Sequence, residues 1–176
     1  TINNWNVWFT GFSANEYLQL NTTIAKSSYS TLWYQTPTSS VFYVGSTGTA
    51  ANYQNGDAYV AYCFAAIAGY SAFGSYTGNG SADGPFVYTG FRPRWVMTKS
   101  SSGVENWLMV DTSRDTYNPE SNYLKANASD AEASSTIMDI LSNGFKLKTT
   151  GGPNTSSGTY IYAAFAENPF KYSRAR

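Results

Sequence analysis

Two stretches of the chain share one pattern of hydrophobic and polar positions, and both predict a β-strand. The first runs from Gly56 to Ala66 and the second from Gly158 to Ala166. Each begins at a glycine turn, contains no proline and consists of aromatic, β-branched and small residues, a composition that favours strand over helix. Because neither face of the first stretch is rich in charge, we expect it to lie inside a sandwich or against a partner.

The two stretches close a longer internal repeat. Three further sets of residues return in the same order, and all offsets lie between 101 and 106. These sets are Asn4-Trp5 with Asn106-Trp107, Tyr17 to Asn21 with Tyr123 to Asn127, and Phe42 to Gly48 with Phe145 to Gly151. We therefore expect β unit A over residues 1–68 and β unit B over residues 90–176. Residues 69–89, rich in glycine and aromatics, are expected to form an ordered crossover that packs on both units.

The remaining pattern predicts short strands separated by turns. This organisation indicates an all-β fold, a β-sandwich or jelly-roll-like structure built from two pseudo-repeated units. One helical turn is also expected in residues 21–26 and another in 127–133, where Ser129 would be the N-cap. The further expected strands cover residues 5–9, 41–45, 91–99, 107–110 and 145–148.

Unit B is introduced by the strand over residues 91–99, and the repeat requires a matching strand before Asn4-Trp5 of unit A. A sheet without that strand leaves backbone groups unpaired beside apolar side chains. Its source is either a preceding segment of a longer chain or a neighbouring subunit that adds a strand. We favour the longer chain, because tandem repeats of fibre proteins run on upstream. In either case, the strand near Trp5 to Phe9 should be a sheet edge.

Composition narrows the possible functions. Hydrophobic residues make up 42% of the chain and charged residues 12%, a balance that excludes intrinsic disorder. Eleven basic and eleven acidic residues cancel, so charge gives no case for nucleic acid or an anionic membrane as partner. No apolar run of the sequence reaches the length of a membrane span. We therefore expect neither a nucleic-acid partner nor membrane insertion.

The sequence also argues against catalysis. It contains no histidine, which removes the usual triads and the imidazole metal sites. Its single Cys63 lies within the first apolar stretch, so we expect a small core residue rather than a nucleophile. The expectation is a protein with no catalytic residue, no metal and no cofactor.

The densest polar cluster is the loop from Asp111 to Pro119. Asp111 and Asp115 are candidates to bind a cation, or to hold a sugar together with Arg114 and Tyr117. The alternative, which we favour, is that Arg114 pairs with an aspartate and that the Asp and Asn side chains cap turns. Calcium loops have more closely spaced oxygen ligands than this loop offers.

A second candidate for ligand binding is Trp33-Tyr34, which lies in a stretch rich in serine and threonine. Sugars stack on flat aromatic surfaces of this kind. The alternative, which we favour, is that these rings belong to the core, as large aromatics in all-β proteins do more often.

Several segments resemble a repeat domain of tailed-phage virion proteins, which occurs in tail fibres and in capsid-decorating proteins. These segments are Gly69 to Ser81, Gly90 to Lys99, Asn106-Trp107, and the ending Tyr160 to Phe170 with its Ala-Phe-Ala-Glu-Asn-Pro-Phe motif. The resemblance implies a non-enzymatic virion protein at a fibre end or on the particle surface, for host attachment or decoration. It further implies contact with other virion proteins, with copies of itself as a homotrimer, and with a host-surface glycan.

One departure from that family concerns the end of the first apolar stretch. Family members often carry polar or charged residues where this chain has Ala65 to Ala68. An apolar contact, within the chain or to a neighbour, is favoured there. The alternative from another functional class is a free glycan-binding module or a polysaccharide depolymerase.

Overall fold

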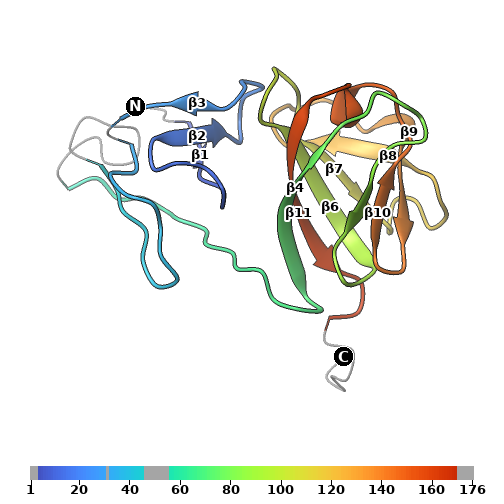
Figure 1. Cartoon of the computed structure of the whole chain (residues 1–176), viewed down its shortest axis with the longest axis horizontal. Coiled ribbons are helices and arrows are strands. Elements are labelled where there is room, and N and C mark those ends of the chain that lie inside the picture. The colour runs from blue at the N-terminus through green and yellow to red at the C-terminus, as the bar shows by residue number, and fades with distance from the viewer. Residues whose placement is uncertain (1–3, 31, 46–55, 170–176) are drawn as a thin grey trace.

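The computed structural model describes residues 4–30, 32–45 and 56–169, and over these residues the protein is all-β (Figure 1). The strands form a three-stranded sheet of order β1-β2-β3 and an eight-stranded sheet of order β4-β11-β6-β7-β8-β9-β10-β5. One short 3₁₀ turn, η1 (Gly152–Asn154), is present beside the larger sheet. No helix in the described part of the chain is long and apolar enough to cross a membrane.

All strand pairs in both sheets are antiparallel. The small sheet consists of β1 (Asn6–Val7), β2 (Glu16–Gln19) and β3 (Ser27–Ser28). The large sheet consists of β4 (Ser71–Thr77), β5 (Phe86–Tyr88), β6 (Pro93–Ser100), β7 (Leu108–Asp111), β8 (Glu120–Lys125), β9 (Ala133–Leu141), β10 (Gly144–Leu147) and β11 (Thr159–Ala166).

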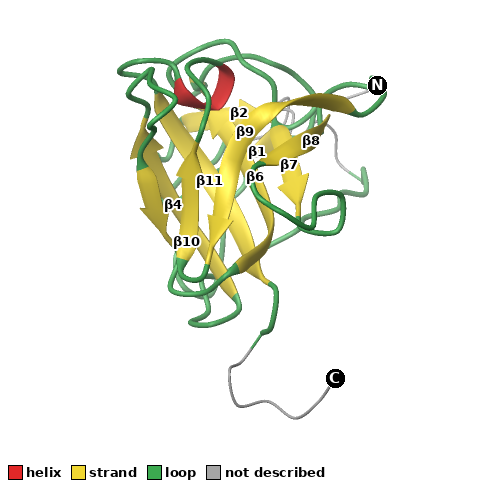
Figure 2. Ribbon diagram, turned by 90° about the vertical axis from the view of Figure 1, so that its right-hand side faces the viewer, coloured by secondary structure: helices red, strands yellow, loops and turns green. Residues whose placement is uncertain are grey.

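The large sheet curls around a hydrophobic core into a near-barrel, sandwich-like structure (Figure 2). Phe145 of β10 packs edge-on against Tyr76 of β4 and Tyr162 of β11, so strands far apart in the sheet face each other across the core. The expected strand is confirmed as β6, which places Val96 in this core on one face and Met97 against a second core on the other face. Burial of these side chains is the main stabilisation of the barrel.

A second, smaller core joins the small sheet to the outer face of the large one. Phe12 and Leu18 of unit A pack there with Trp107 and Ile161 of unit B. The indole Nε1 of Trp107 also donates to the carbonyl oxygen of Gln19 at 2.9 Å. Unit A is therefore fixed against the outside of the barrel, as Figure 1 shows.

The repeat is confirmed in the first half of each unit. In unit A, the backbone nitrogen of Trp5 donates to Oδ1 of Asn21 at 2.9 Å, and the Asn21 amide donates to Oδ1 of Asn4 at 3.0 Å. Unit B makes both bonds, each at 2.8 Å, with the corresponding residues Trp107, Asn127 and Asn106.

The strand registers agree as well. Tyr17 lies opposite Ser27 in unit A, and Tyr123 lies opposite Ala133 in unit B, both with the same offset of 106. The hairpins β1-β2-β3 and β7-β8-β9 are therefore two copies of one structure.

The strand β1 is a sheet edge, with only β2 beside it among the described residues, which confirms the edge predicted from the sequence.

The second half of unit A differs from the prediction. Residues 41–45 and 57–66 form no strand, although unit B has β10 and β11 at the corresponding positions. Cys63 is exposed, so its assignment to the core was wrong. The physical reason is that a strand needs hydrogen-bonded neighbours. In unit B, β4 and β6 flank β11, and the described part of unit A contains no counterpart of either strand.

The two expected helical turns are also absent. Residues 21–26 and 127–133 form no helical turn, and Ser129 caps none, because the Asn21 and Asn127 side chains bind the residues just before β1 and β7 instead. Lys26 likewise donates its backbone N–H to the carbonyl oxygen of Ser101 in unit B.

Residues 69–89, expected as an ordered crossover, are ordered and supply both edge strands, β4 and β5, of the large sheet.

Candidate assembly surface

In the polar loop between β7 and β8, the carboxylate of Asp111 is bonded to residues of the same loop. Oδ1 of Asp111 accepts hydrogen bonds from the backbone nitrogens of Ser113 and Arg114, both at 3.1 Å. Nε of Arg114 lies 2.6 Å from Oδ2 of Asp111, and its Nη1 lies 2.7 Å from Oε2 of Glu132. The hydrogen bond to Glu132, followed by that to Asp111, raises the pKa of the Arg114 guanidinium.

The carboxylate of Asp115 also accepts hydrogen bonds from nearby residues of the chain. Its Oδ2 accepts from the backbone nitrogens of Ser121 and Asn122, both at 2.6 Å, and its Oδ1 accepts from Nδ2 of Asn122 at 2.7 Å. These are the turn-capping contacts that the sequence offered as the alternative to a ligand site. Asp111 thus holds the turn that follows β7, and Asp115 holds the loop to β8.

Glu120, at the start of β8, lies behind this loop and was not singled out from the sequence. Its side chain is 1% exposed, and its Oε2 has no hydrogen-bond partner among the described residues. Burial raises the pKa of the Glu120 carboxyl to about 7, and the nearby charge of Asp115 adds to the effect while Arg92 opposes it. No motif in the sequence distinguishes this glutamate from an exposed one.

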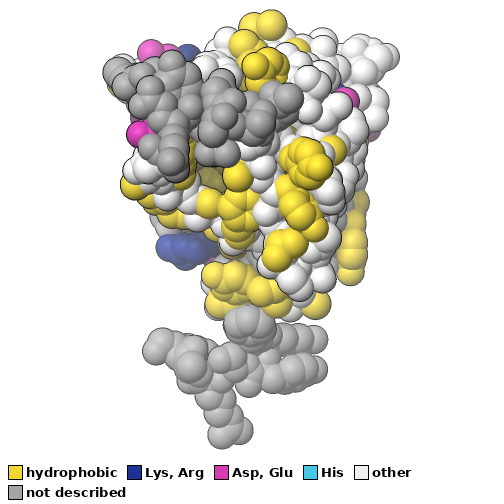
Figure 3. Space-filling model, turned by 90° about the vertical axis from the view of Figure 1, so that its left-hand side faces the viewer, with side chains coloured by type: hydrophobic (Ala, Val, Ile, Leu, Met, Phe, Trp, Pro, Cys, Tyr) yellow, Lys and Arg dark blue, Asp and Glu magenta, His cyan; other side chains and the backbone are white. Residues whose placement is uncertain are grey.

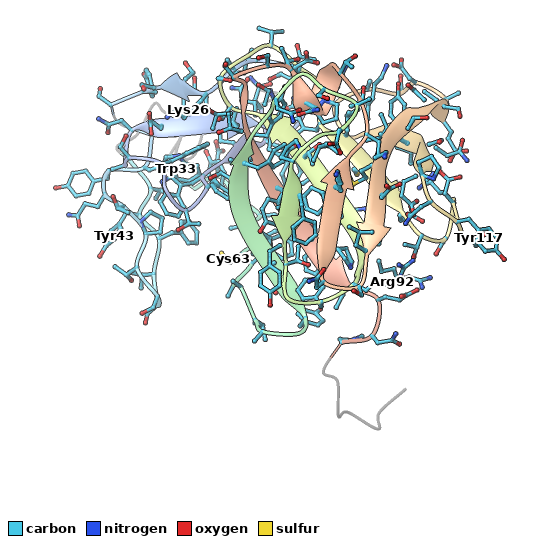
Figure 4. The ribbon with its side chains drawn as sticks, turned by 45° about the vertical axis from the view of Figure 1, so that its right-hand side comes forward. Lys26, Trp33, Tyr43, Cys63, Arg92 and Tyr117 are labelled. Carbon is cyan, nitrogen blue, oxygen red and sulfur yellow. The ribbon has the colours of Figure 1, made fainter. Side chains whose placement is uncertain are left out.

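The aromatic candidates do not come together. Tyr117 is 86% exposed on the polar loop and Tyr34 is 68% exposed in unit A. Trp33 is half-buried, and its indole nitrogen is buried without a partner among the described residues. Figure 4 places Trp33 and Tyr117 at opposite ends of the molecule. The two glycan-binding candidates are therefore separate surfaces rather than one rim.

A continuous run of exposed residues, 57–67, is rich in apolar side chains, and we call it the apolar segment. Every residue in it is exposed, including five large hydrophobic side chains. These are Tyr59, Val60, Tyr62, Phe64 and Ile67. Figure 3 views the side of the molecule on which unit A lies, where hydrophobic side chains are visible in several patches. A soluble protein rarely leaves such a continuous stretch uncovered unless the stretch is an interaction site.

The apolar segment is extended and is held at its C-terminal end. The ring of Phe64 packs on Phe73 and Phe165 of the large sheet, with centroids 6.1 and 6.0 Å away. Oγ of Ser71 donates to the carbonyl of Ala65 at 2.7 Å. Further towards the N-terminus, the ring of Tyr62 stacks on Trp5, with centroids 6.1 Å apart. The segment therefore runs from β4, where Ile67 forms an isolated bridge to Ser71, towards the open edge at β1, and none of its residues belongs to a strand.

The described residues contain no group of three or more acidic or cysteine side chains placed to hold a metal ion. A shallow groove of about 280 Å³ lies where the loop after β6 meets the loop before β11, lined largely by serine and glycine. Near it, Lys99 is buried, and burial lowers the pKa of its ammonium to about 8. Its Nζ donates to the carbonyls of Ser100 at 2.7 Å and Thr23 at 3.3 Å, so it links the two units.

Comparison with known proteins identifies the family of the chain. No curated protein and no solved structure matches the chain. A family model matches residues 1–169, and the matched region includes unit A, the two edge strands supplied by residues 69–89, and unit B through β11. The chain therefore belongs to the family described as Domain of unknown function (DUF7483).

Proposed function

We propose that this protein is a non-enzymatic structural component of a bacteriophage virion, located at a fibre end or on the particle surface. Its role there is host attachment or decoration of the particle, in contact with other virion proteins and with copies of itself. The observation that carries the proposal is the apolar segment, a row of exposed aromatic and aliphatic side chains on an extended backbone.

The exposure of the apolar segment supports an assembly role on physical grounds. Exposed apolar surface costs free energy in water, at about 25 cal/mol for each Å² that a partner would remove. Monomeric proteins rarely expose a continuous apolar surface, whereas a component of a particle buries such a surface against its neighbours on assembly. The resemblance to virion repeat domains supplies the kind of particle.

The hydrogen bonds of the two loop aspartates support a non-enzymatic role rather than that of a depolymerase. A depolymerase requires two carboxylates that face a substrate across a cleft. Asp111 and Asp115 instead accept hydrogen bonds from the backbone and side chains of their own loop. Their arrangement is that of a structural loop.

Locating the protein on purified phage particles tests this proposal. Cryo-EM of particles labelled with an antibody against the chain should show it at fibre tips or at regular positions on the capsid. Recovery of the protein only in the soluble fraction of the lysate, with none on intact particles, would contradict a virion role. A capsule-degradation assay with the same preparation should show no activity.

Glycan binding is the second candidate, and the exposure of Tyr117 favours it. The ring is 86% exposed and stands on the loop that Asp111 and Asp115 hold in place. An exposed ring on a rigid loop is a suitable stacking surface for a sugar. A glycan array with the wild-type protein and the Tyr117→Ala variant tests this role: signal lost in the variant supports it, and signal retained assigns binding elsewhere.

A further inference from the structure

We propose that the apolar segment and β1 are the two walls of a gap that accepts one antiparallel β-strand with the residue pattern of β6, supplied by polypeptide outside these 176 residues. The inference rests on the proposed assembly function, because it names what covers the exposed surface. It goes further by specifying the secondary structure, direction and register of the partner.

Unit B provides the template for this gap. There, β6 lies between β7 and β11 and is hydrogen-bonded to both. Met97 of β6 lies opposite Met109 on one side and opposite Ala163 on the other. Both flanking strands run antiparallel to β6.

Unit A contains both flanking elements without the strand between them. Its β1 corresponds to β7 with an offset of 102, and its apolar segment corresponds to β11 with an offset of 101. These offsets place Val7 and Tyr62 on either side of the position that Met97 occupies in unit B. The Trp5–Tyr62 stacking contact shows that the two walls lie within reach of each other's side chains.

The state of the backbone favours a strand as the occupant. The free edge of β1 and the extended residues 60–64 both present backbone groups without a strand partner in the described part of the chain. Such groups are the template for strand addition. The Phe64 contacts with Phe73 and Phe165 hold the segment extended before a partner arrives, which lowers the entropy cost of binding.

The side chains favour a strand that is apolar on both faces. The apolar segment exposes Val60, Tyr62 and Phe64 on one side of its backbone. Tyr59, Ala61 and Cys63 alternate with them on the other side. In β6, Val96 is buried on one face of the sheet while Met97 packs into the second core on the other. A strand of this kind would bury apolar side chains above and below the sheet of unit A.

A second copy of this chain is the competing occupant. Two copies fit a twofold exchange in which each apolar segment lies in the gap of the other copy, antiparallel to both walls. Three copies do not close in this way, because each segment would need three strand neighbours. The template favours a β6-type strand, since that is the pattern found between β7 and β11.

A labelled synthetic peptide with the sequence Arg92 to Ser100 tests the proposal on the full chain. Fluorescence anisotropy should show saturable one-to-one binding in the micromolar range. Hydrogen exchange of residues 57–67 should slow when the peptide is bound. A Met97→Pro peptide, which lacks an N–H and cannot occupy a central strand, should bind about tenfold more weakly or worse. A Met97→Leu peptide keeps volume and should bind as the parent does.

The matched change on the protein is Ala61→Pro. It should weaken binding of the parent peptide by at least about tenfold. Its thermal midpoint should stay unchanged, because the residue lies in no strand of the isolated chain. No binding of the parent peptide to a folded, monomeric protein would overturn the proposal. A dimer in sedimentation that Ala61→Pro dissociates and the peptide does not would assign the gap to a second copy. Neither result alters whether the protein is found on particles, which tests the proposed function separately.

Discussion

Glu120 is a buried carboxylic acid, and its environment predicts an unusual dependence of stability on pH. Its pKa is about 7 in the folded protein against 4.5 for the unperturbed group, chiefly because of burial. A raised pKa means that folding favours the protonated form, so this contribution is complete below pH 4.5 and is lost as pH rises through 7. Above pH 7 the loss is on the order of 3 kcal/mol.

Chemical unfolding between pH 4.5 and pH 8 measures that loss. The wild-type protein should become less stable across this range, and Glu120→Gln, which cannot ionise, should flatten the profile. Lys99, with its lowered pKa of about 8, changes stability mainly above this range, and Glu16, with a pKa of about 2, mainly below it. An unchanged slope in Glu120→Gln would show that another group titrates.

Asp115 illustrates the structural role of the polar loop. Its carboxylate accepts three hydrogen bonds from Ser121 and Asn122, and charge-assisted bonds of this kind are among the stronger ones. We expect Asp115→Ala to lower the free energy of unfolding by about 2–3 kcal/mol. Tyr117→Ala, two residues away and exposed, should change it by less than about 0.5 kcal/mol. Equal effects of the two variants in urea denaturation would contradict the assignment.

Among elements, the duplicated hairpins give a matched pair of variants. Asn127 makes its two bonds in a partly buried setting, whereas Asn21 makes the same two bonds at the exposed edge of unit A. Water replaces lost bonds more easily at the exposed site. Asn127→Ala should therefore cost about 1–2 kcal/mol and Asn21→Ala clearly less, as measured by thermal unfolding. A larger loss in Asn21→Ala would mean that unit A is more deeply covered than the structure has it.

The same hairpins show what the sequence could predict. The returning Asn-Trp set located β1 and β7, next to residues that make local side-chain-to-backbone bonds. The returning Tyr-to-Asn set was recognised only as a repeat, and the strands β2 and β8 that overlap it were not predicted. Alternation located β6. The pattern failed for residues 57–66, which match β11 in composition but form no strand. Strand preference describes a half-buried pleated surface, so it cannot report whether a neighbouring strand exists.

The candidate sites were predictable to a similar degree. Sequence reasoning found the polar loop and the exposed Tyr117, since both are local features. It missed the burial of Glu120 and the exposure of Cys63, which depend on packing between distant residues. The available signal for the apolar segment was the strand missing from the repeat, and the predicted open edge at β1 is present among the described residues.

At the scale of the whole molecule, unit B forms a near-barrel, and unit A is a partial copy of it that lacks the matching strands among the described residues. Unit B with β4 and β5 forms a near-barrel with its own core. Unit A contributes a three-stranded sheet attached by the second core, together with the apolar segment that no strand of the described chain covers. An assembly component is expected to show this combination of a stable body and an unfinished edge.

Hydrogen exchange of the isolated full-length protein tests this claim most directly. Amides in residues 60–64 should exchange at nearly the rate of an unstructured peptide, while those of the corresponding strand, β11, should be protected because they lie between β4 and β6. Comparable protection of both stretches would mean that the apolar segment already has a sheet partner, and the account of an incomplete unit A would then be wrong.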